Sequence, residues 1–282
     1  MNIFEAILLG IIQGLTEFLP ISSTGHVTLT GKLLNLISVD NPERWTSFIA
    51  VIQLGTLLAV LIYFWNDLCN VLINFMKENF RERKSFRSQS FYSRLGWFII
   101  IGTLPVVFVG IGFKDIIEGS ITKNLYIISW SLIILGIVLA GAEKIGKFNR
   151  ELNELKWYDA LIIGIAQTLA LIPGSSRSGT TITAGLFLGL KRETAARFSF
   201  LLSVPAVLAS GLFEFYQAIN YIDFNNVIYL IVATAAAAIS GYWTIEFLLR
   251  FLKRNTTYLF VVYRISIGVL ILVLVGYGLI SP

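Results

Sequence analysis

The sequence contains one cysteine, Cys69, one histidine and few charged residues, and each of these shortages excludes some classes of protein or site. A single cysteine excludes an intrachain disulfide and gives no information about the redox compartment. Asp, Glu, Lys and Arg make up 14% of the residues, against about 25% in soluble domains. The strand-length alternation of a membrane β-barrel is also missing, whereas 56% of the residues are hydrophobic and the mean hydropathy is +0.76. These features indicate an integral membrane protein built from helices.

The chain also lacks the features of a secreted or a nucleic-acid-binding protein. Its start, MNIFEAILLG, has no basic segment and carries Glu5, so it does not resemble a cleaved signal peptide. The net charge of +5 is better explained by basic residues in the cytoplasmic loops of a membrane protein than by binding to nucleic acid. We therefore expect membrane lipids around the chain and no nucleic acid.

An internal repeat is the strongest signal in the sequence. Residues 4–25 read FEAILLGIIQGLTEFLPISSTG, and residues 158–179 read YDALIIGIAQTLALIPGSSRSG. A shift of 154 positions without a gap superimposes identical residues, among them Gln13 on Gln167 and Ser22 on Ser176. In both copies an apolar run breaks at Pro or Gly into a loop rich in hydroxyl groups. Because a repeat fixes the architecture and this one carries polar groups, we expect it to build the active site.

Six other runs approach the length of about 20 apolar residues that a membrane-crossing helix needs. They are residues 48–65, 95–113, 124–142, 198–216, 226–248 and 259–280. In the repeats, by contrast, the apolar stretches 4–19 and 158–172 are short and stop at a proline, and short stretches follow at 26–37 and 180–190. Short, interrupted segments at corresponding places in two halves indicate re-entrant hairpins.

The predicted fold is therefore an all-α integral membrane protein with six transmembrane helices and two re-entrant helical hairpins in an inverted-topology repeat. We expect a single membrane domain over residues 1–282, with halves of about 1–142 and 158–282.

Positive charge predicts the side of the membrane on which each connection lies. Four segments are basic and should be cytoplasmic: 66–94, 143–157, 191–197 and 249–258. The first of them is predicted to be a basic loop. The opposite connections are poor in positive charge, because 38–47 has only Arg44 and 217–225 has neither Lys nor Arg. In this arrangement the first hairpin enters from outside and the second from inside, so the two loops should meet within the membrane.

The hairpins carry ionisable residues, which are costly inside a bilayer and are therefore functional candidates. The first holds Glu17, Gln13 one helical turn before it, and His26 after three hydroxyl residues; the second holds Arg177 in the run PGSSRSGTT. A loop of small residues before a helix N-terminus presents backbone N–H groups to an anion, and a guanidinium suits phosphate oxygens. With Glu17 or His26 to move protons and a serine to attack, the set has what phosphoryl chemistry requires.

Most of these residues also have a structural interpretation. Glu17 would then serve only as an ion-pair partner of Arg177, and the hydroxyls would bond the preceding helical turn. Gln13 would donate a hydrogen bond between helices. Three glycines of the repeats most simply allow close helix packing: Gly10, Gly14 and Gly164. His26 has no obvious packing use.

These motifs resemble those of the undecaprenyl-diphosphate phosphatase family, the bacitracin-resistance proteins of bacterial inner membranes. The family's two signatures, (E/Q)xxxE and PGxSRSxxT, match 13–17 and 173–181, and similarity in length, order and hydropathy extends over essentially the whole chain. Position 13 is Gln where many relatives have Glu, which leaves one carboxylate here. The resemblance implies hydrolysis of undecaprenyl diphosphate to the monophosphate and inorganic phosphate, which recycles the lipid carrier for peptidoglycan and other wall polymers.

The motif match implies the functional residues. The catalytic residues would be Glu17, Ser22, Ser23, His26, Ser176 and Arg177. We expect the terminal phosphate to be bound by residues of the second loop, namely Gly174, Ser175, Arg177, Ser178, Gly179 and Thr181. A divalent cation, Mg²⁺ or Ca²⁺, would be bound by Glu17 with help from Gln13 and would neutralise the diphosphate. The attacking group stays open: Ser23 or Ser22 is favoured, with Ser176 and water as alternatives.

The resemblance also implies a site that faces the periplasmic or outer side, where bacitracin competes by binding the substrate; it leaves a homodimer open. A transporter or flippase for a phosphorylated polyprenyl lipid is the alternative function, since inverted repeats with paired hairpins are a transporter architecture. The histidine-dependent lipid phosphatases need two histidines, and this chain has one.

Overall fold

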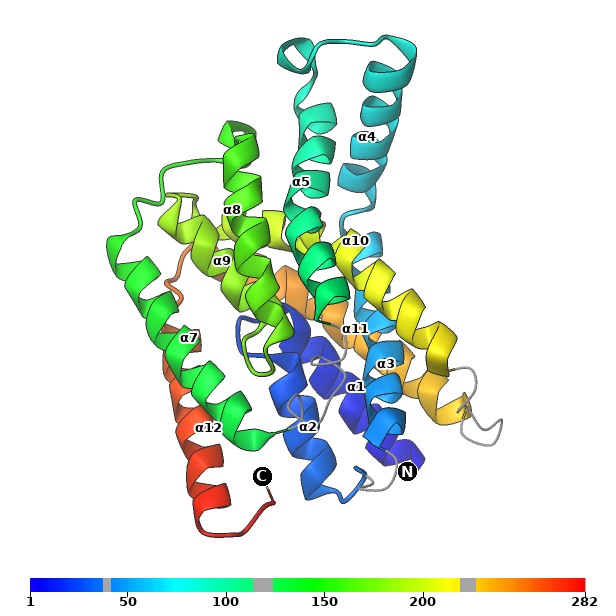
Figure 1. Cartoon of the computed structure of the whole chain (residues 1–282), viewed down its shortest axis with the longest axis vertical. Helices are drawn as coiled ribbons and strands as arrows, with labels where there is room; N and C mark the ends of the chain where they lie inside the picture. The colour runs from blue at the N-terminus through cyan, green and yellow to red at the C-terminus, as the bar shows by residue number, and fades with distance from the viewer. Residues whose placement is uncertain (38–41, 114–123, 219–226, 282) are drawn as a thin grey trace.

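The computed structural model describes residues 1–37, 42–113, 124–218 and 227–281, and within these ranges the chain is almost entirely helical, with no strand (Figure 1). Six of the described helices are long and apolar enough to cross a membrane. They are α3 Pro42–Tyr63, α5 Phe91–Gly112, α7 Leu125–Ile145, α10 Arg192–Ala218, α11 Val227–Leu252 and α12 Tyr258–Gly276. They match the six predicted spans with ends shifted by a few residues, so the helical membrane fold is confirmed.

Each copy of the repeat forms two short helices joined by a loop. The first copy contains α1 Ile3–Phe18 and α2 Ser23–Leu33; in the second, α8 Trp157–Thr168 and a 3-10 turn lead to α9 Arg177–Phe187. The longest of these, α1, has 16 residues, and at 1.5 Å per residue it is about 24 Å long, shorter than a hydrocarbon core of about 30 Å. The helix pairs lie where the repeat predicts them. Their re-entrant position in a bilayer and the inversion of the two halves stay predictions.

Glycines let the first helix of each pair pack closely against a spanning helix. α1 packs on α11, where a Cβ at Gly10 would lie 2.2 Å from the Ala233 carbonyl oxygen. α8 packs on α5, where a Cβ at Gly164 would lie 2.3 Å from the Gly102 carbonyl oxygen. Gly14 is equally close to α11. The predicted packing role of these glycines is confirmed.

The basic segment 66–94 is mostly helical, although its charges suggested a loop. α4 Trp65–Met76 follows α3 after a break at Phe64, and a π-helical turn and a 3-10 turn then lead into α5. Apolar residues recur at helical spacing within this segment, at Leu68, Val71, Leu72 and Phe75, a pattern that favours a helix. α4 and the start of α5 form the projection at the top of Figure 1.

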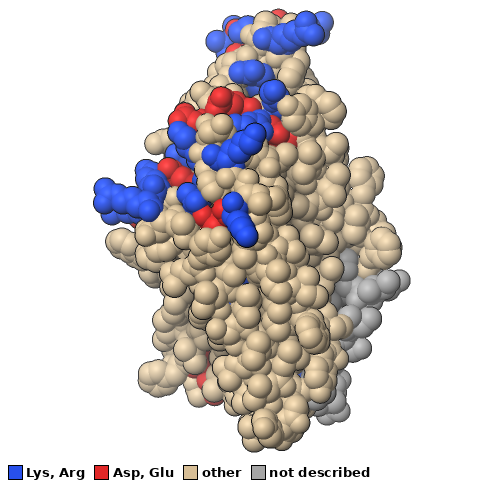
Figure 2. Space-filling model, turned by 90° about the vertical axis from the view of Figure 1, so that its left-hand side faces the viewer, with Lys and Arg blue, Asp and Glu red and all other residues tan. Residues whose placement is uncertain are grey.

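Lys and Arg gather at the end of the molecule that carries this projection, on the face shown in Figure 2. The connections from α7 to α8 and from α11 to α12 lie toward the same end, and the two chain termini lie toward the other (Figure 1). The predicted one-sided distribution of basic segments is therefore observed. Of the predicted connections on the opposite side, residues 38–41 and 219–225 lie outside the described residues.

Candidate active site

The loops of the two helix pairs touch each other. Ser178 Oγ donates a hydrogen bond to the Leu19 carbonyl oxygen at 3.0 Å. Arg177 Nη2 donates to Glu17 Oε1 at 3.0 Å, across a separation of 160 residues in the chain. The residues of the two family signatures thus meet at one place in the fold.

Equivalent serines begin the second helix of each pair. Ser22 and Ser176 have φ values of 75° and 68°, in the left-handed region that costs a residue with a Cβ about 1–2 kcal/mol. Each serine is the N-cap of its helix, and its Oγ accepts from the amide three residues later, Gly25 N at 3.3 Å and Gly179 N at 3.1 Å. The N-termini of α2 and α9 border the same cavity, so the positive ends of two helix dipoles face it.

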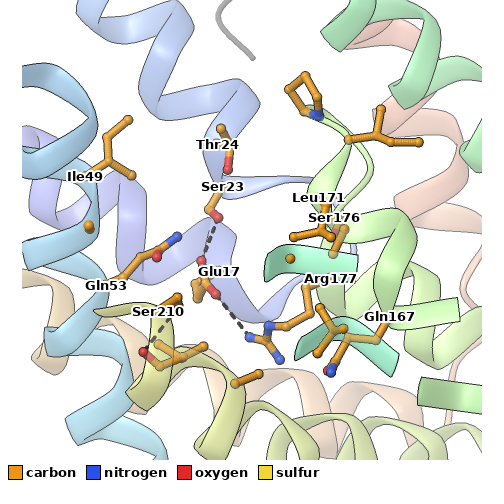
Figure 3. Close-up of a pocket in the computed structure, with 18 of the residues that line it drawn as sticks. Glu17, Ser23, Thr24, Ile49, Gln53, Gln167, Leu171, Ser176, Arg177 and Ser210 are labelled. Carbon is orange, nitrogen blue, oxygen red and sulfur yellow. Dashed lines mark hydrogen bonds and ion pairs between the residues drawn. The ribbon is translucent and has the colours of Figure 1, made fainter. Parts of the chain in front are cut away.

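Glu17 accepts most of the polar contacts of the site. It is 7% exposed, and its Oε2 accepts from Gln13 Nε2 at 2.9 Å. Its Oε2 also accepts from Ser23 Oγ at 2.6 Å, and its Oε1 accepts from Arg177 (Figure 3). A carboxylate that accepts a short hydrogen bond from a hydroxyl is placed to take the proton of that hydroxyl. Among the serines of the site, Ser23 therefore has the contact that activation requires.

Arg177 uses only part of its guanidinium within the protein. Besides the bond to Glu17, Nη1 donates to the Ser199 carbonyl oxygen at 3.4 Å. A guanidinium has five N–H groups, and Arg177 also lines the cavity. Its remaining donors can therefore bind an anion while the ion pair with Glu17 persists.

A cavity of about 740 Å³ lies beside these residues. Its polar end is formed by Glu17, Ser23, Ser176 and Arg177 (Figure 3), together with Ser22. Much of the remaining wall is apolar and comes from α3, α5 and α10; it includes Ile49, Val106, Val107, Ile111, Val207 and Phe213. In α5 and α10 the lining segments follow Pro105 and Pro205, which interrupt the hydrogen bonds of their helices. A polar end beside a long apolar wall suits an amphiphile with an anionic head group.

His26 is directed away from the cavity. Its Nδ1 lies 2.7 Å from the Ser22 carbonyl oxygen and its Nε2 lies 2.8 Å from the Tyr263 hydroxyl, and its ring stacks on that of Tyr263. Because a carbonyl oxygen only accepts, Nδ1 carries a proton and donates it to the Ser22 carbonyl oxygen. In this position His26 connects the turn at Ser22 to α12 through its hydrogen bonds to Ser22 and Tyr263.

The expected phosphate-binding residues divide into two groups. Gly174 and Arg177 line the cavity. The other four do not line it: Ser175 and Gly179 are buried, Ser178 Oγ donates to the Leu19 carbonyl oxygen of the first loop, and Thr181 Oγ1 donates to the Arg177 carbonyl oxygen and shares a hydrogen bond with Ser199 Oγ. Gly174 has a φ of 85°, and a Cβ there would lie 2.4 Å from the Ile128 carbonyl oxygen, so this turn requires glycine.

Comparison with known proteins assigns the chain to a family. The sequence matches the model of the bacitracin resistance protein BacA over residues 6–270. The chain belongs to this family. A protein of Syntrophobacter fumaroxidans named undecaprenyl-diphosphatase is 55% identical over 268 residues, which cover 95% of each chain. Proteins with the same name from Chlorobaculum tepidum, 47% identical with 100% of each chain covered, and Myxococcus xanthus, 46% identical over 100% of this chain and 92% of the relative, are also similar.

A second arginine, Arg264 of α12, lies beneath both loops of this BacA-family chain and is absent from the sequence predictions. It is 1% exposed, and its guanidinium donates to the carbonyl oxygens of Pro20 at 3.1 Å and Ser175 at 2.9 Å. It forms no ion pair with a carboxylate among the described residues. The signal was present, because Arg264 is the only charged residue in the predicted span 259–280 and a charge in a span is a functional candidate.

The site has the oxygen donors of a partial metal site. No group of three His, Cys, Asp or Glu residues that could hold an ion forms in the part of the chain that the structure describes. Glu17 is one carboxylate, and beside it Gln13 Oε1 is buried without a hydrogen-bond partner among the described residues. Mg²⁺ is commonly bound by one or two carboxylates together with substrate phosphates. The residues therefore fit a cation that the diphosphate helps to bind.

Proposed function

We infer that this chain hydrolyses undecaprenyl diphosphate to undecaprenyl phosphate and inorganic phosphate. The observation that carries this conclusion is the junction of Glu17, Ser23 and Arg177 at the polar end of an apolar cavity. The relatives compared above bear the name of this activity. The reaction returns the lipid carrier to peptidoglycan synthesis and removes the lipid that bacitracin binds, which confers resistance.

The diphosphate would occupy the polar end of the cavity, with the prenyl chain along the apolar walls of α3, α5 and α10. The N-termini of α2 and α9 and the free donors of Arg177 supply positive charge to the terminal phosphate from two sides. Phosphoryl transfer depends mainly on positioning and charge stabilisation, and this arrangement provides both.

Ser23 is the attacking group that the geometry favours. Its Oγ would bond to the terminal phosphorus while its proton passes to Glu17 Oε2 and the bridging P–O bond breaks, so that undecaprenyl phosphate leaves. Water would then cleave the phosphoserine and release inorganic phosphate. Ser22 and Ser176 are less suited, because their hydroxyls already accept the cap bonds of α2 and α9. Protonation of Glu17 would also weaken its attraction for Arg177 and free that guanidinium for the charge that develops on the phosphate.

A divalent cation would be bound by Glu17 and the Gln13 carboxamide oxygen. Such an ion neutralises diphosphate charge as a Lewis acid. Mg²⁺ suits this small donor set better than Ca²⁺, which takes six to eight oxygen ligands.

The position of the cavity supports a site that opens to the periplasmic side of the bacterial inner membrane. The cavity is lined by the start of α3 and by the ends of α5 and α10, which lie away from the basic projection in Figure 1. By the positive-inside rule the basic end is cytoplasmic.

The test is phosphate release from undecaprenyl diphosphate by purified protein in detergent, with and without EDTA, for the wild type and Arg177→Ala. We expect metal-dependent release that collapses in the variant. If folded wild-type protein with Mg²⁺ releases no phosphate, the proposed phosphatase activity is refuted. Lipid transport is then favoured, because a transporter has no gradient to act on in detergent and would show no activity in this assay. Rapid quenching with substrate labelled in the terminal phosphate should give a labelled Ser23 peptide. Full activity of Ser23→Ala without such a peptide would show that water attacks directly.

A further inference from the structure

Gln167 is a buried amide for which the described residues provide no hydrogen bond. It lies in α8 and is 1% exposed, and neither its Nε2 nor its Oε1 has a partner in the described part of the chain. It lines the same cavity as Glu17 and Arg177, and in the view of Figure 3 Arg177 lies between Glu17 and Gln167. Buried polar groups are nearly always hydrogen-bonded, so two unpaired atoms on one side chain at the wall of an active-site cavity require an explanation.

The internal repeat shows which hydrogen-bond acceptor Gln167 lacks. Gln167 corresponds to Gln13 under the shift of 154 residues. In the first copy Gln13 Nε2 donates to Glu17 Oε2 at 2.9 Å, one turn later in the helix. The residue of the second copy that corresponds to Glu17 is Leu171, which also lines the cavity. The second copy therefore keeps the amide and lacks the anionic oxygen to which the amide would donate.

We propose that a non-bridging oxygen of the diphosphate takes the place of this missing carboxylate and accepts a hydrogen bond from Gln167 Nε2. The same head group already has an anion donor in Arg177 at this end of the cavity. An amide adds a hydrogen-bond donor for the head group without adding a charge to the site. Because the amide is shielded from bulk water, water competes little for its bond to the ligand. The inference rests on the function proposed above and adds a binding residue outside both family signatures.

The experiment compares Gln167→Leu and Gln167→Glu with the wild type. Leucine removes both polar atoms at similar volume, and glutamate keeps the shape and repels an anion. A hydrogen bond to a charged group contributes about 1.5–3 kcal/mol, so kcat/KM for undecaprenyl diphosphate should fall about 10- to 100-fold in Gln167→Leu. The fall should be larger in Gln167→Glu. Pyrophosphate should also raise the thermal midpoint of the wild type more than that of either variant.

Thr234→Val is the matched control. Thr234 Oγ1 is another buried atom without a partner among the described residues, and Thr234 does not line the cavity. If an unpaired polar group only lowers stability, both Thr234→Val and Gln167→Leu should be at least as stable as the wild type and keep its kcat/KM and its response to pyrophosphate. That result, with an active wild type, would overturn the inference and leave the proposed function intact. An inactive wild type would refute the function itself, and an unchanged kcat/KM in Gln167→Glu would refute the hydrogen bond to the anion.

Discussion

Replacement of Arg177 by alanine removes the cation of a buried ion pair and a charged donor of the site together. The side chains of Arg177 and Glu17 are 12% and 6% exposed, so neither charge is well solvated. Removal of one partner from a buried pair costs about 3–5 kcal/mol, because the other charge stays buried without compensation. Loss of a donor that stabilises developing charge lowers kcat about 10²- to 10³-fold. We expect Arg177→Ala to be both less stable and nearly inactive.

The double variant Glu17→Gln/Arg177→Met separates these effects. It has no buried charge at the pair, and the glutamine can still accept from Gln13 and Ser23. Since replacement of a buried ion pair by uncharged groups is often close to neutral, most of the lost 3–5 kcal/mol should return. The activity should stay at least about 100-fold below the wild type, because the anion donor and the base are both absent.

Two assays decide the outcome: unfolding by titration with SDS in detergent micelles, and phosphate release from undecaprenyl diphosphate. The reasoning would be refuted if the double variant regained activity together with stability. The pair would then serve only to join the two loops. Equal stability of Arg177→Ala and the double variant would show that Glu17 is not buried as a charge.

Three further predictions concern packing, the loops and pH. Gly10→Leu should prevent the close approach of α1 to α11 and abolish folding, whereas Gly141→Ala in α7, where a Cβ meets nothing within 4 Å, should stabilise the protein by about 0.5–1 kcal/mol; thermal midpoints in detergent test both. Arg264→Lys should lower the thermal midpoint and the activity together, because an ammonium cannot reach the carbonyl oxygens of both loops as a guanidinium does; unchanged values would show that the fork is not needed. Ser90 N–H donates to Glu78 Oε2 at 2.8 Å, and this bond with that from Lys84 lowers the pKa of the Glu78 carboxyl below 4.5. The resulting stability is present above about pH 4.5 and is lost as the pH falls through the lowered pKa, so the connection between α4 and α5 should become sensitive to an acid protease there, and Glu78→Gln should remove this pH dependence.

The spans and helix pairs could be predicted because hydropathy and the repeat act over many residues. The helix α4 was missed because the basic residues that follow it, from Lys77 to Arg94, were given more weight than its apolar spacing. Charge indicates the side of the membrane rather than the backbone conformation. The two antiparallel loops were predicted to meet, and the hydrogen bond between Glu17 and Arg177 joins them in the structure.

The directions of individual side chains could not be predicted from the sequence. His26 and Thr181 lie in the first two turns of α2 and α9. Whether a residue there faces the cavity or the protein depends on the rotation of the helix about its axis, which packing sets. The start of α2 at Ser23 turns His26 toward Tyr263. The sequence repeat shows that Leu171 stands in the second copy where the first copy has the carboxylate of Glu17. It does not show that Gln167 is buried, and the proposed role of Gln167 depends on that burial.

The ion pair between Glu17 and Arg177 also sets the order of events during biosynthesis. Glu17 leaves the ribosome 160 residues before its partner, and at about 5–20 residues per second this interval lasts about 8–32 s. The helix against which α1 packs, α11, is made later still. Throughout this time the Glu17 carboxylate lacks its arginine partner and the glycine face of α1 is uncovered, so we expect the first helix pair to be unstable in lipid. We therefore expect the first half to reach its final packing only after the second half is made, and a chain that stops before residue 177 to be degraded by membrane quality control.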